Sequence, residues 1–326
     1  LAKEIAQASK PFSKVLEVGS NDGYLLEALA KEGMKPIGIE PSEILVSECK
    51  NKGIRVHQGY LSSETSHELS DEHGKFNVIV GNNVFAHIDD LQMAFKLVYD
   101  LLEDEGTFIF EVAQFEKIVT DGIFDTIYHE HMSYYTVTGC LRLAQNSGLR
   151  IEKVKEITTH GGSYRFYLRK TVDMKPTEEV LKMCDLEADS GLTSSRIFQK
   201  CKSDIEEKRS EVYRLLSSCK NNIMVGYGAP AKLVTLAYQV GLDQFPIKLV
   251  VDDNHLKQGK FIPGLGYEIQ SPSKVKEYLR QNNDKDVEII IFPWNLSEEV
   301  INKLSYFEGS SKHYLVFSPK VSRIRV

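Results

Sequence analysis

The chain has 326 residues, 42% hydrophobic and 26% charged, which is the composition of an ordinary globular protein long enough for two domains. A formal net charge of -6 leaves no basic surface for nucleic acid or an anionic membrane. We find no apolar run of membrane-spanning length and no charged-then-apolar leader, so we expect a cytoplasmic protein with no nucleic-acid or membrane partner.

The first predicted elements form a strand, a tight turn and a helix. Residues 14–18 are apolar and close on Gly19, and a helical pattern runs over residues 24–32. A second strand at residues 36–40 ends in Glu40, whose carboxylate is placed to hold ribose hydroxyls at the carboxyl edge of a sheet. Together these features indicate a nucleotide site.

The turn itself reads Glu-x-Gly-x-Asn-x-Gly from Glu17 to Gly23, which departs from the GxGxxG fingerprint of dinucleotide sites. Glu17, Asp22 and Glu40 make its surroundings acidic. An acidic turn suits a cationic sulfonium better than a pyrophosphate, which would need bare amides. The alternative is a structural turn of some other α/β protein.

Further strands alternate with helical windows, as in a parallel sheet. We expect them at residues 54–57, 76–80 and 107–111, followed by two final strands at 151–155 and 163–170 with residues 159–162 as the turn between them. Asn82 and His87 follow the strand at 76–80, at the sheet edge where ligands bind. A lone histidine in such a place is more often structural than catalytic.

Residues 124–131, Phe-Asp-Thr-Ile-Tyr-His-Glu-His, concentrate chemistry-bearing side chains. Its imidazoles and carboxylates can titrate near neutral pH, as proton abstraction next to a carbonyl requires. A metal site is the alternative, but a helical zinc pair would have histidines at i and i+4, whereas His129 and His131 are two apart. We therefore expect no metal.

The second half begins with helical residues 176–219 and continues as a second strand-and-helix pattern ending in a last strand at 314–317. Its first turn, residues 226–232, carries glycines, a helix start and Lys232, and is a candidate diphosphate cradle. The same turn satisfies GxGxxA, with Asp252 or Asp253 about twenty residues later, so a nicotinamide site is the alternative.

Four ordered motifs resemble the sugar C-methyltransferases of deoxysugar biosynthesis, typified by the C-3'-methyltransferase of the tetronitrose pathway. The motifs lie at residues 16–26, 128–131, 160–163 and 226–232. The resemblance implies an α/β protein with a class I methyltransferase Rossmann-like domain (1–172), a helical connector (173–220) and a second Rossmann-like α/β domain that helps to bind a sugar nucleotide (221–326). Members of that family usually begin with a zinc-binding domain built on four cysteines, to which nothing in this sequence corresponds.

The resemblance further implies S-adenosylmethionine as cofactor and a dTDP- or GDP-linked 4-keto-6-deoxysugar as acceptor, methylated at C-3 through an enolate. The expected cofactor-binding residues are Glu17, Gly19, Ser20, Asn21, Asp22, Gly23, Glu40 and Asn82. The expected acceptor-binding residues are His160, Gly161, Gly162, Ser163, Gly228, Ala229 and Lys232.

Four residues are expected to carry the chemistry. His131 is the predicted base, Tyr128 and Glu130 would orient the sugar and tune its imidazole, and His87 would donate to the sugar or the enolate. Other hypotheses are an oxidoreductase that uses the turn at 226–231, a non-catalytic sugar-nucleotide-binding module, and an O-methyltransferase as a variant of the first reading.

Overall fold

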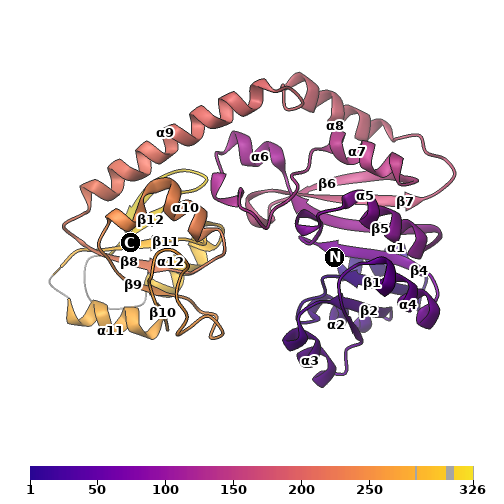
Figure 1. Ribbon diagram of the computed structural model, residues 1–326, viewed down its shortest axis with the longest axis horizontal. Coiled ribbons are helices and arrows are strands. Elements are labelled where there is room, and N and C mark those ends of the chain that lie inside the picture. The colour runs from indigo at the N-terminus through magenta and orange to yellow at the C-terminus, as the bar shows by residue number, and fades with distance from the viewer. Residues whose placement is uncertain (283–284, 306–311, 326) are drawn as a thin grey trace. The chain divides into compact units, whose positions relative to one another are not determined.

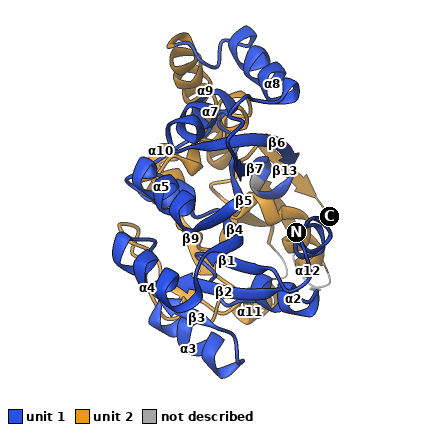
Figure 2. Cartoon of the chain, turned by 90° about the vertical axis from the view of Figure 1, so that its right-hand side faces the viewer, with its two compact units in different colours: residues 1–115, 130–194 blue, residues 116–129, 195–326 orange. Residues whose placement is uncertain are grey.

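The computed structural model describes residues 1–282, 285–305 and 312–325, which form two compact units (Figure 2). One unit consists of residues 1–115 and 130–194, and the other of residues 116–129 and 195–326. The chain thus leaves the first unit after Phe115 and re-enters it at Glu130. Within the described residues, no helix is long and apolar enough to cross a lipid bilayer.

The first unit contains a seven-stranded sheet in the order β3-β2-β1-β4-β5-β7-β6. β7 is antiparallel to its neighbours β5 and β6, and the pairs from β3 to β5 are parallel. The strands are β1 (Lys14–Val18), β2 (Lys35–Glu40), β3 (Val56–Gln58), β4 (Phe76–Asn82), β5 (Leu102–Ala113), β6 (Leu149–Ile157) and β7 (Ser163–Lys170). This arrangement confirms the predicted class I methyltransferase fold.

Helices cover this sheet (Figure 1). Their apolar faces are buried in its hydrophobic core. In α5, for example, Ala94, Phe95 and Val98 recur at helical spacing and are buried, while Asp90 caps the helix by accepting a hydrogen bond from the Met93 amide. The helices are α1 (Ala2–Ala8), α2 (Tyr24–Lys31), α3 (Glu43–Asn51), α4 (Ser63–His73), η1 (Phe85–His87), α5 (Leu91–Leu101), α7 (Val137–Asn146), η3 (Thr159–Gly161) and α8 (Glu178–Asp189).

The second unit contains a six-stranded sheet in the order β10-β9-β8-β11-β12-β13. The strands are β8 (Ile223–Tyr227), β9 (Ile247–Val251), β10 (Ile269–Gln270), β11 (Val287–Ile291), β12 (Lys312–Val316) and β13 (Ser322–Arg325). The expectation that the last strand lies at 314–317 is wrong, because β13 follows β12 as an antiparallel edge strand. Its exposed, charged residues give no apolar run by which to recognise it.

The second unit includes helices from residues 116–129, which come before the rest of this unit in the sequence. Its helices are α6 (Phe115–Thr120), η2 (Phe124–Thr126), α9 (Arg196–Ser218), α10 (Leu233–Val240), η4 (Leu242–Gln244), α11 (Ser273–Gln281), η5 (Trp294–Leu296) and α12 (Ser297–Ser305). Ile123 and Phe124 lie in the two hydrophobic cores of this unit. Lys208 of α9 donates from Nζ to the carbonyls of Asp121 and Gly122, at 2.7 and 2.8 Å. Residues 116–129 are therefore an integral part of the second unit.

Candidate functional site

The predicted cofactor residues gather at the carboxyl ends of three neighbouring strands. Glu17 lies in β1, residues 19–23 form the turn that follows it, Glu40 ends β2 and Asn82 ends β4. The Glu40 carboxylate organises this turn, because its two oxygens accept hydrogen bonds from the amides of Asn21 and Ser42, each at 3.0 Å. Each oxygen keeps a lone pair for a further donor, such as a ribose hydroxyl.

Polar atoms at this turn are buried without satisfaction. Among the described residues, eight buried side-chain polar atoms have no hydrogen-bond partner, and three of them belong to Glu17, Ser20 and Asn82. Buried polar atoms are normally paired, so this concentration marks a place where a polar ligand completes the hydrogen bonding. These polar groups, together with Glu40, therefore fit the ribose and amino-acid parts of S-adenosylmethionine.

The charge of Glu17 responds to its surroundings. Burial raises the pKa of this carboxyl to about 8, a hydrogen bond from the Asn82 side chain opposes the shift, and the negative charge of Asp22 adds to it. Near neutral pH the carboxyl is thus mostly protonated. A cation placed beside it would favour the ionised form and gain a direct electrostatic interaction.

The loop after β4 carries His87 in η1 and brings it against His131. Gly81 allows this fold-back, since a Cβ there would lie 2.4 Å from the Phe85 ring. The segment after Glu130 runs along η1: the amide of Met132 donates to the Ala86 carbonyl at 2.8 Å, and the Tyr135 hydroxyl donates to the Phe85 carbonyl at 2.9 Å. The rings of His87 and His131 meet edge to face, with centroids 5.0 Å apart.

Hydrogen bonding fixes the orientation of His87. Its Nδ1 lies 2.8 Å from the backbone carbonyl oxygen of Glu130. A carbonyl can only accept, so we assign the proton to Nδ1 and the lone pair of the neutral ring to Nε2. Glu130 therefore contacts His87 through its backbone, while its side chain is exposed. Tyr128 belongs to the second unit, where it lies beside His129.

The glycine turn at residues 159–162 joins β6 to β7 at the same sheet edge. Its position follows from strand register, because Ser163 pairs with Ala113 at the end of β5 and with Ile157 at the end of β6. Gly161 and Gly162 have positive φ angles of 87 and 125°. The side chain of His160 lies outside the described part of the chain.

One edge of the first sheet thus presents three features in spatial order. The acidic turn lies at β1 and β2, the two histidines lie at the next strand, β4, and the glycine turn lies beyond β5. Adjacent strands are about 4.8 Å apart, so a small molecule can reach from one feature to the next. The arrangement places the histidine pair between the acidic turn and the glycine turn.

The turn at residues 226–232 of the second unit makes hydrogen bonds and packing contacts with other residues of the same unit. The Asp252 carboxylate accepts a hydrogen bond from the Ala229 amide at 2.7 Å. A Cβ on Gly228 would lie 2.4 Å from Cδ of Pro293, so this glycine serves close packing. A dinucleotide turn would require free amides and a glycine that lets the ligand approach closely. Here the Ala229 amide is bonded to Asp252, and Gly228 packs against Pro293.

Lys232 likewise has partners within the second unit. Its Nζ lies 3.4 Å from Oδ2 of Asp125 and 4.1 Å from the centre of the Trp294 ring. The Trp294 indole donates to the same Asp125 oxygen at 2.8 Å. Burial lowers the pKa of Lys232, and the Asp125 charge opposes this shift. The sequence motif gave Lys232 a ligand role, but it did not indicate that Asp125 is its counterion.

Within the described residues, no group of three or more His, Cys, Asp and Glu side chains is arranged to hold a metal ion. The sequence alone also did not reveal Glu111, which accepts a hydrogen bond from Thr159 of the glycine turn, or its cross-strand partner Arg165. No local signal marks them, because their partners are distant along the chain.

Comparison with known proteins gives matches along nearly the whole chain. A family model described as "Methyltransferase domain" matches residues 1–154, and one described as "C-methyltransferase C-terminal domain" matches residues 158–319. The chain is 28% identical over 309 residues to C-methyltransferase NovU of Streptomyces niveus, which covers 94% of this chain and 72% of that protein.

Other similarities cover less of the molecule. A ubiquinone biosynthesis O-methyltransferase of Methylococcus capsulatus is 31% identical over 110 residues, covering 32% of this chain and 45% of that protein. Among solved structures, magnesium protoporphyrin IX methyltransferase from Synechocystis shares 16% identity, with a TM-score of 0.42 and coverage of 52% of this chain and 79% of that one.

Proposed function

The chain belongs to the C-methyltransferases that use S-adenosylmethionine, and we propose that its acceptor is a nucleotide-linked 4-keto-6-deoxysugar that it methylates at C-3. This membership replaces the oxidoreductase and non-catalytic hypotheses. The turn at 226–232 agrees with this, because its Ala229 amide and Gly228 are already engaged by Asp252 and Pro293 and do not form an open dinucleotide turn.

The observation that carries the proposal is the contact between His87, in the loop after β4, and His131. A C–H carbon becomes a nucleophile near neutral pH when an adjacent carbonyl makes its proton acidic and a base removes it. Imidazole has the appropriate pKa range for this task. A ketone next to the methylated carbon is therefore the acceptor chemistry that a histidine base between two ligand-binding turns serves best.

We assign the proton transfer to His131. Its imidazole would take the C-3 proton, leaving an enolate whose oxygen is O-4. His87, oriented by the Glu130 carbonyl, lies next to it and can hydrogen-bond this oxygen from Nε2 when its ring is protonated. The cofactor supplies an electrophilic methyl group on a sulfonium, and the turn at 17–23 with Glu40 and Asn82 would hold and orient it.

The remaining residue assignments stay predictions. Tyr128 and Glu130 are proposed to orient the sugar, and the glycine turn with Ser163 to bind it. Participation of the second unit, through Gly228, Ala229 and Lys232, is also a prediction. Each of those three residues has a structural role within that unit, so a ligand role would be an addition to it.

The decisive experiment incubates the protein with S-adenosylmethionine labelled with ¹³C in the methyl group and with dTDP- or GDP-linked 4-keto-6-deoxyhexose. We expect a product heavier by one methyl group, with carbon–carbon coupling of the label to C-3. Methylation of the corresponding 4-hydroxy sugar, with the label bound to oxygen, would refute the proposal in favour of O-methylation.

A second measurement isolates the base. In deuterated water, with S-adenosylhomocysteine in place of the methyl donor, the wild-type protein should exchange the C-3 proton of the acceptor. His131→Asn should lose both this exchange and turnover. A variant that still exchanged C-3 at the wild-type rate would exclude His131 as the base.

A further inference from the structure

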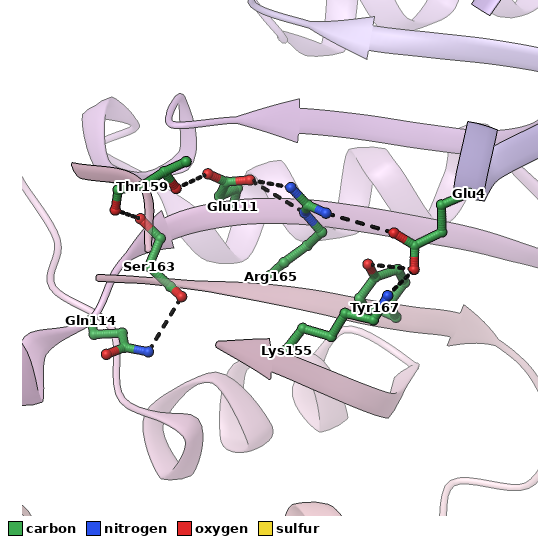
Figure 3. Close-up of polar contacts among 8 residues, drawn as sticks. All are labelled: Glu4, Glu111, Gln114, Lys155, Thr159, Ser163, Arg165 and Tyr167. Atoms are coloured by element: carbon green, nitrogen blue, oxygen red, sulfur yellow. Dashed lines mark hydrogen bonds and ion pairs between the residues drawn. The ribbon is translucent and has the colours of Figure 1, made fainter. Parts of the chain in front are cut away.

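An ion pair with a buried carboxylate lies at the carboxyl end of β5, next to the histidine loop. Glu111 of β5 and Arg165 of β7 are direct cross-strand partners, and Arg165 donates from Nη2 and Nε to Oε2 of Glu111 at 2.9 and 3.3 Å (Figure 3). Glu111 is 5% exposed. A charge so deeply buried requires such a partner, so the pair fixes the Glu111 carboxylate in one position.

The other oxygen of this carboxylate reaches the glycine turn. Oε1 of Glu111 accepts a hydrogen bond from the Thr159 hydroxyl at 2.7 Å, a short bond as expected for an ionised acceptor. The Thr159 carbonyl in turn accepts from the Ser163 hydroxyl at 3.1 Å and from the Gly162 amide at 3.0 Å. Thr159 is thus the point at which the ion pair holds the turn.

Gln114 holds the far side of the same turn. Its backbone amide donates to the Gly162 carbonyl at 3.1 Å, and its side-chain amide donates to the Ser163 carbonyl at 3.3 Å. Gly161 and Gly162 impose little conformation of their own, because glycine populates positive φ without steric cost. The shape of the turn is therefore set by these external contacts.

Glu111 also contacts the loop that carries the histidines. Its backbone carbonyl accepts a hydrogen bond from the Asn83 amide at 2.8 Å. Asn83 has a positive φ of 54° and follows directly after β4, four residues before His87. One residue thus fixes the backbone of the histidine loop on one side and the glycine turn on the other.

We propose that Glu111, Arg165 and Thr159 are positioning residues that hold the glycine turn at 159–162 in register with the histidine pair, and thereby set the affinity for the acceptor. The inference rests on the proposed function, in which that turn binds the acceptor. Glu111 and Arg165 lie outside the turn and do not need to touch the acceptor, since they act through Thr159, the first residue of the turn.

Thr159→Val tests this inference, because it removes the hydroxyl and keeps the shape of the side chain. We expect the KM for the acceptor to rise about five-fold, with kcat and the affinity for S-adenosylmethionine changed by less than about two-fold. Thr159→Ser, which restores the donor, should return KM to near the wild-type value. Thr158→Val is the matched control, because Thr158 is an exposed neighbour outside the network.

Hydrogen exchange supplies a readout that needs no acceptor. In Thr159→Val, the amides of Gly162 and Ser163 should exchange about five-fold faster than in the wild type, and those of β1 should not change. Unchanged exchange at the turn, or an equal loss of cofactor affinity and kcat, would overturn the positioning role. Failure of the wild type to methylate any keto sugar nucleotide would instead refute the proposed function, and the acceptor part of the inference with it.

Discussion

Glu17→Gln should remove a pH dependence of stability that the wild-type fold carries. Burial raises the pKa of the Glu17 carboxyl from 4.5 to about 8. Between these values the folded protein holds a proton that the unfolded chain has released, so the stabilisation is complete below about pH 4.5 and is lost as the pH rises through 8. Glutamine has a similar size and does not ionise, so it cannot contribute this dependence.

The expected magnitude follows from the two pKa values. Stability should fall by about 1.4 kcal/mol per pH unit over this range, which amounts to about 3.5 kcal/mol between about pH 5 and pH 8. The free energy of unfolding of the variant, relative to wild type, should therefore improve by that amount over the same interval. Asp22 and Glu40 are present in both proteins, so their contributions largely cancel in the comparison.

Urea unfolding at several pH values measures this difference. Far-UV circular dichroism reports both units, whereas the fluorescence of Trp294, the only tryptophan of the chain, reports the second unit. The effect should appear in the transition of the first unit and be absent from fluorescence if the units unfold separately. A wild-type-minus-variant difference that stays constant from pH 5 to 8 would refute a buried, protonated Glu17.

Further predictions concern ligand binding and the second unit. Calorimetry in buffers of different ionisation enthalpy should show that binding of S-adenosylmethionine near pH 7 releases up to about one proton from the wild type and fewer from Glu17→Gln, whereas equal release would exclude Glu17 as its source. His131→Asn should abolish turnover, with the affinity for S-adenosylmethionine changed less than about two-fold. A variant that turned over at the wild-type rate would contradict the role of His131. Asp125→Asn should destabilise the second unit by about 3 kcal/mol, because it leaves Lys232 buried without a counterion. Adding Lys232→Met should restore much of this loss in Trp294 fluorescence unfolding, and simple additivity of the two changes would argue against the pair.

Local patterns in the sequence predicted most of the first unit. The alternation of apolar strands and helical windows predicted the parallel strands of β1 to β5, though not their order. Residues at the carboxyl ends of strands, such as Glu40 and Asn82, were predicted to lie at the sheet edge, as the structure has them. His87 could be placed at that edge but not beside His131, because the contact depends on how the segment after Glu130 packs on η1.

The residues that the sequence did not reveal act through distant partners. Asp125 stands in the segment that the sequence singled out, yet its pairing with Lys232 and Trp294 joins residues far apart along the chain. Glu111 is a charged residue in an otherwise apolar part of its strand, and its role becomes clear only from its cross-strand partner Arg165. Such pairings follow from strand register, which periodicity alone does not determine.

Residues 116–129 belong to the second unit although they lie between two segments of the first, and this limits how the enzyme can be divided into fragments. A fragment that begins at residue 195 would lack Ile123 and Phe124 in its cores and Asp125 beside Lys232. The second unit is therefore not a gene segment that can be excised or exchanged between relatives by a single crossover. A chimaera that keeps both units intact must take residues 116–129 and the C-terminal region from the same parent.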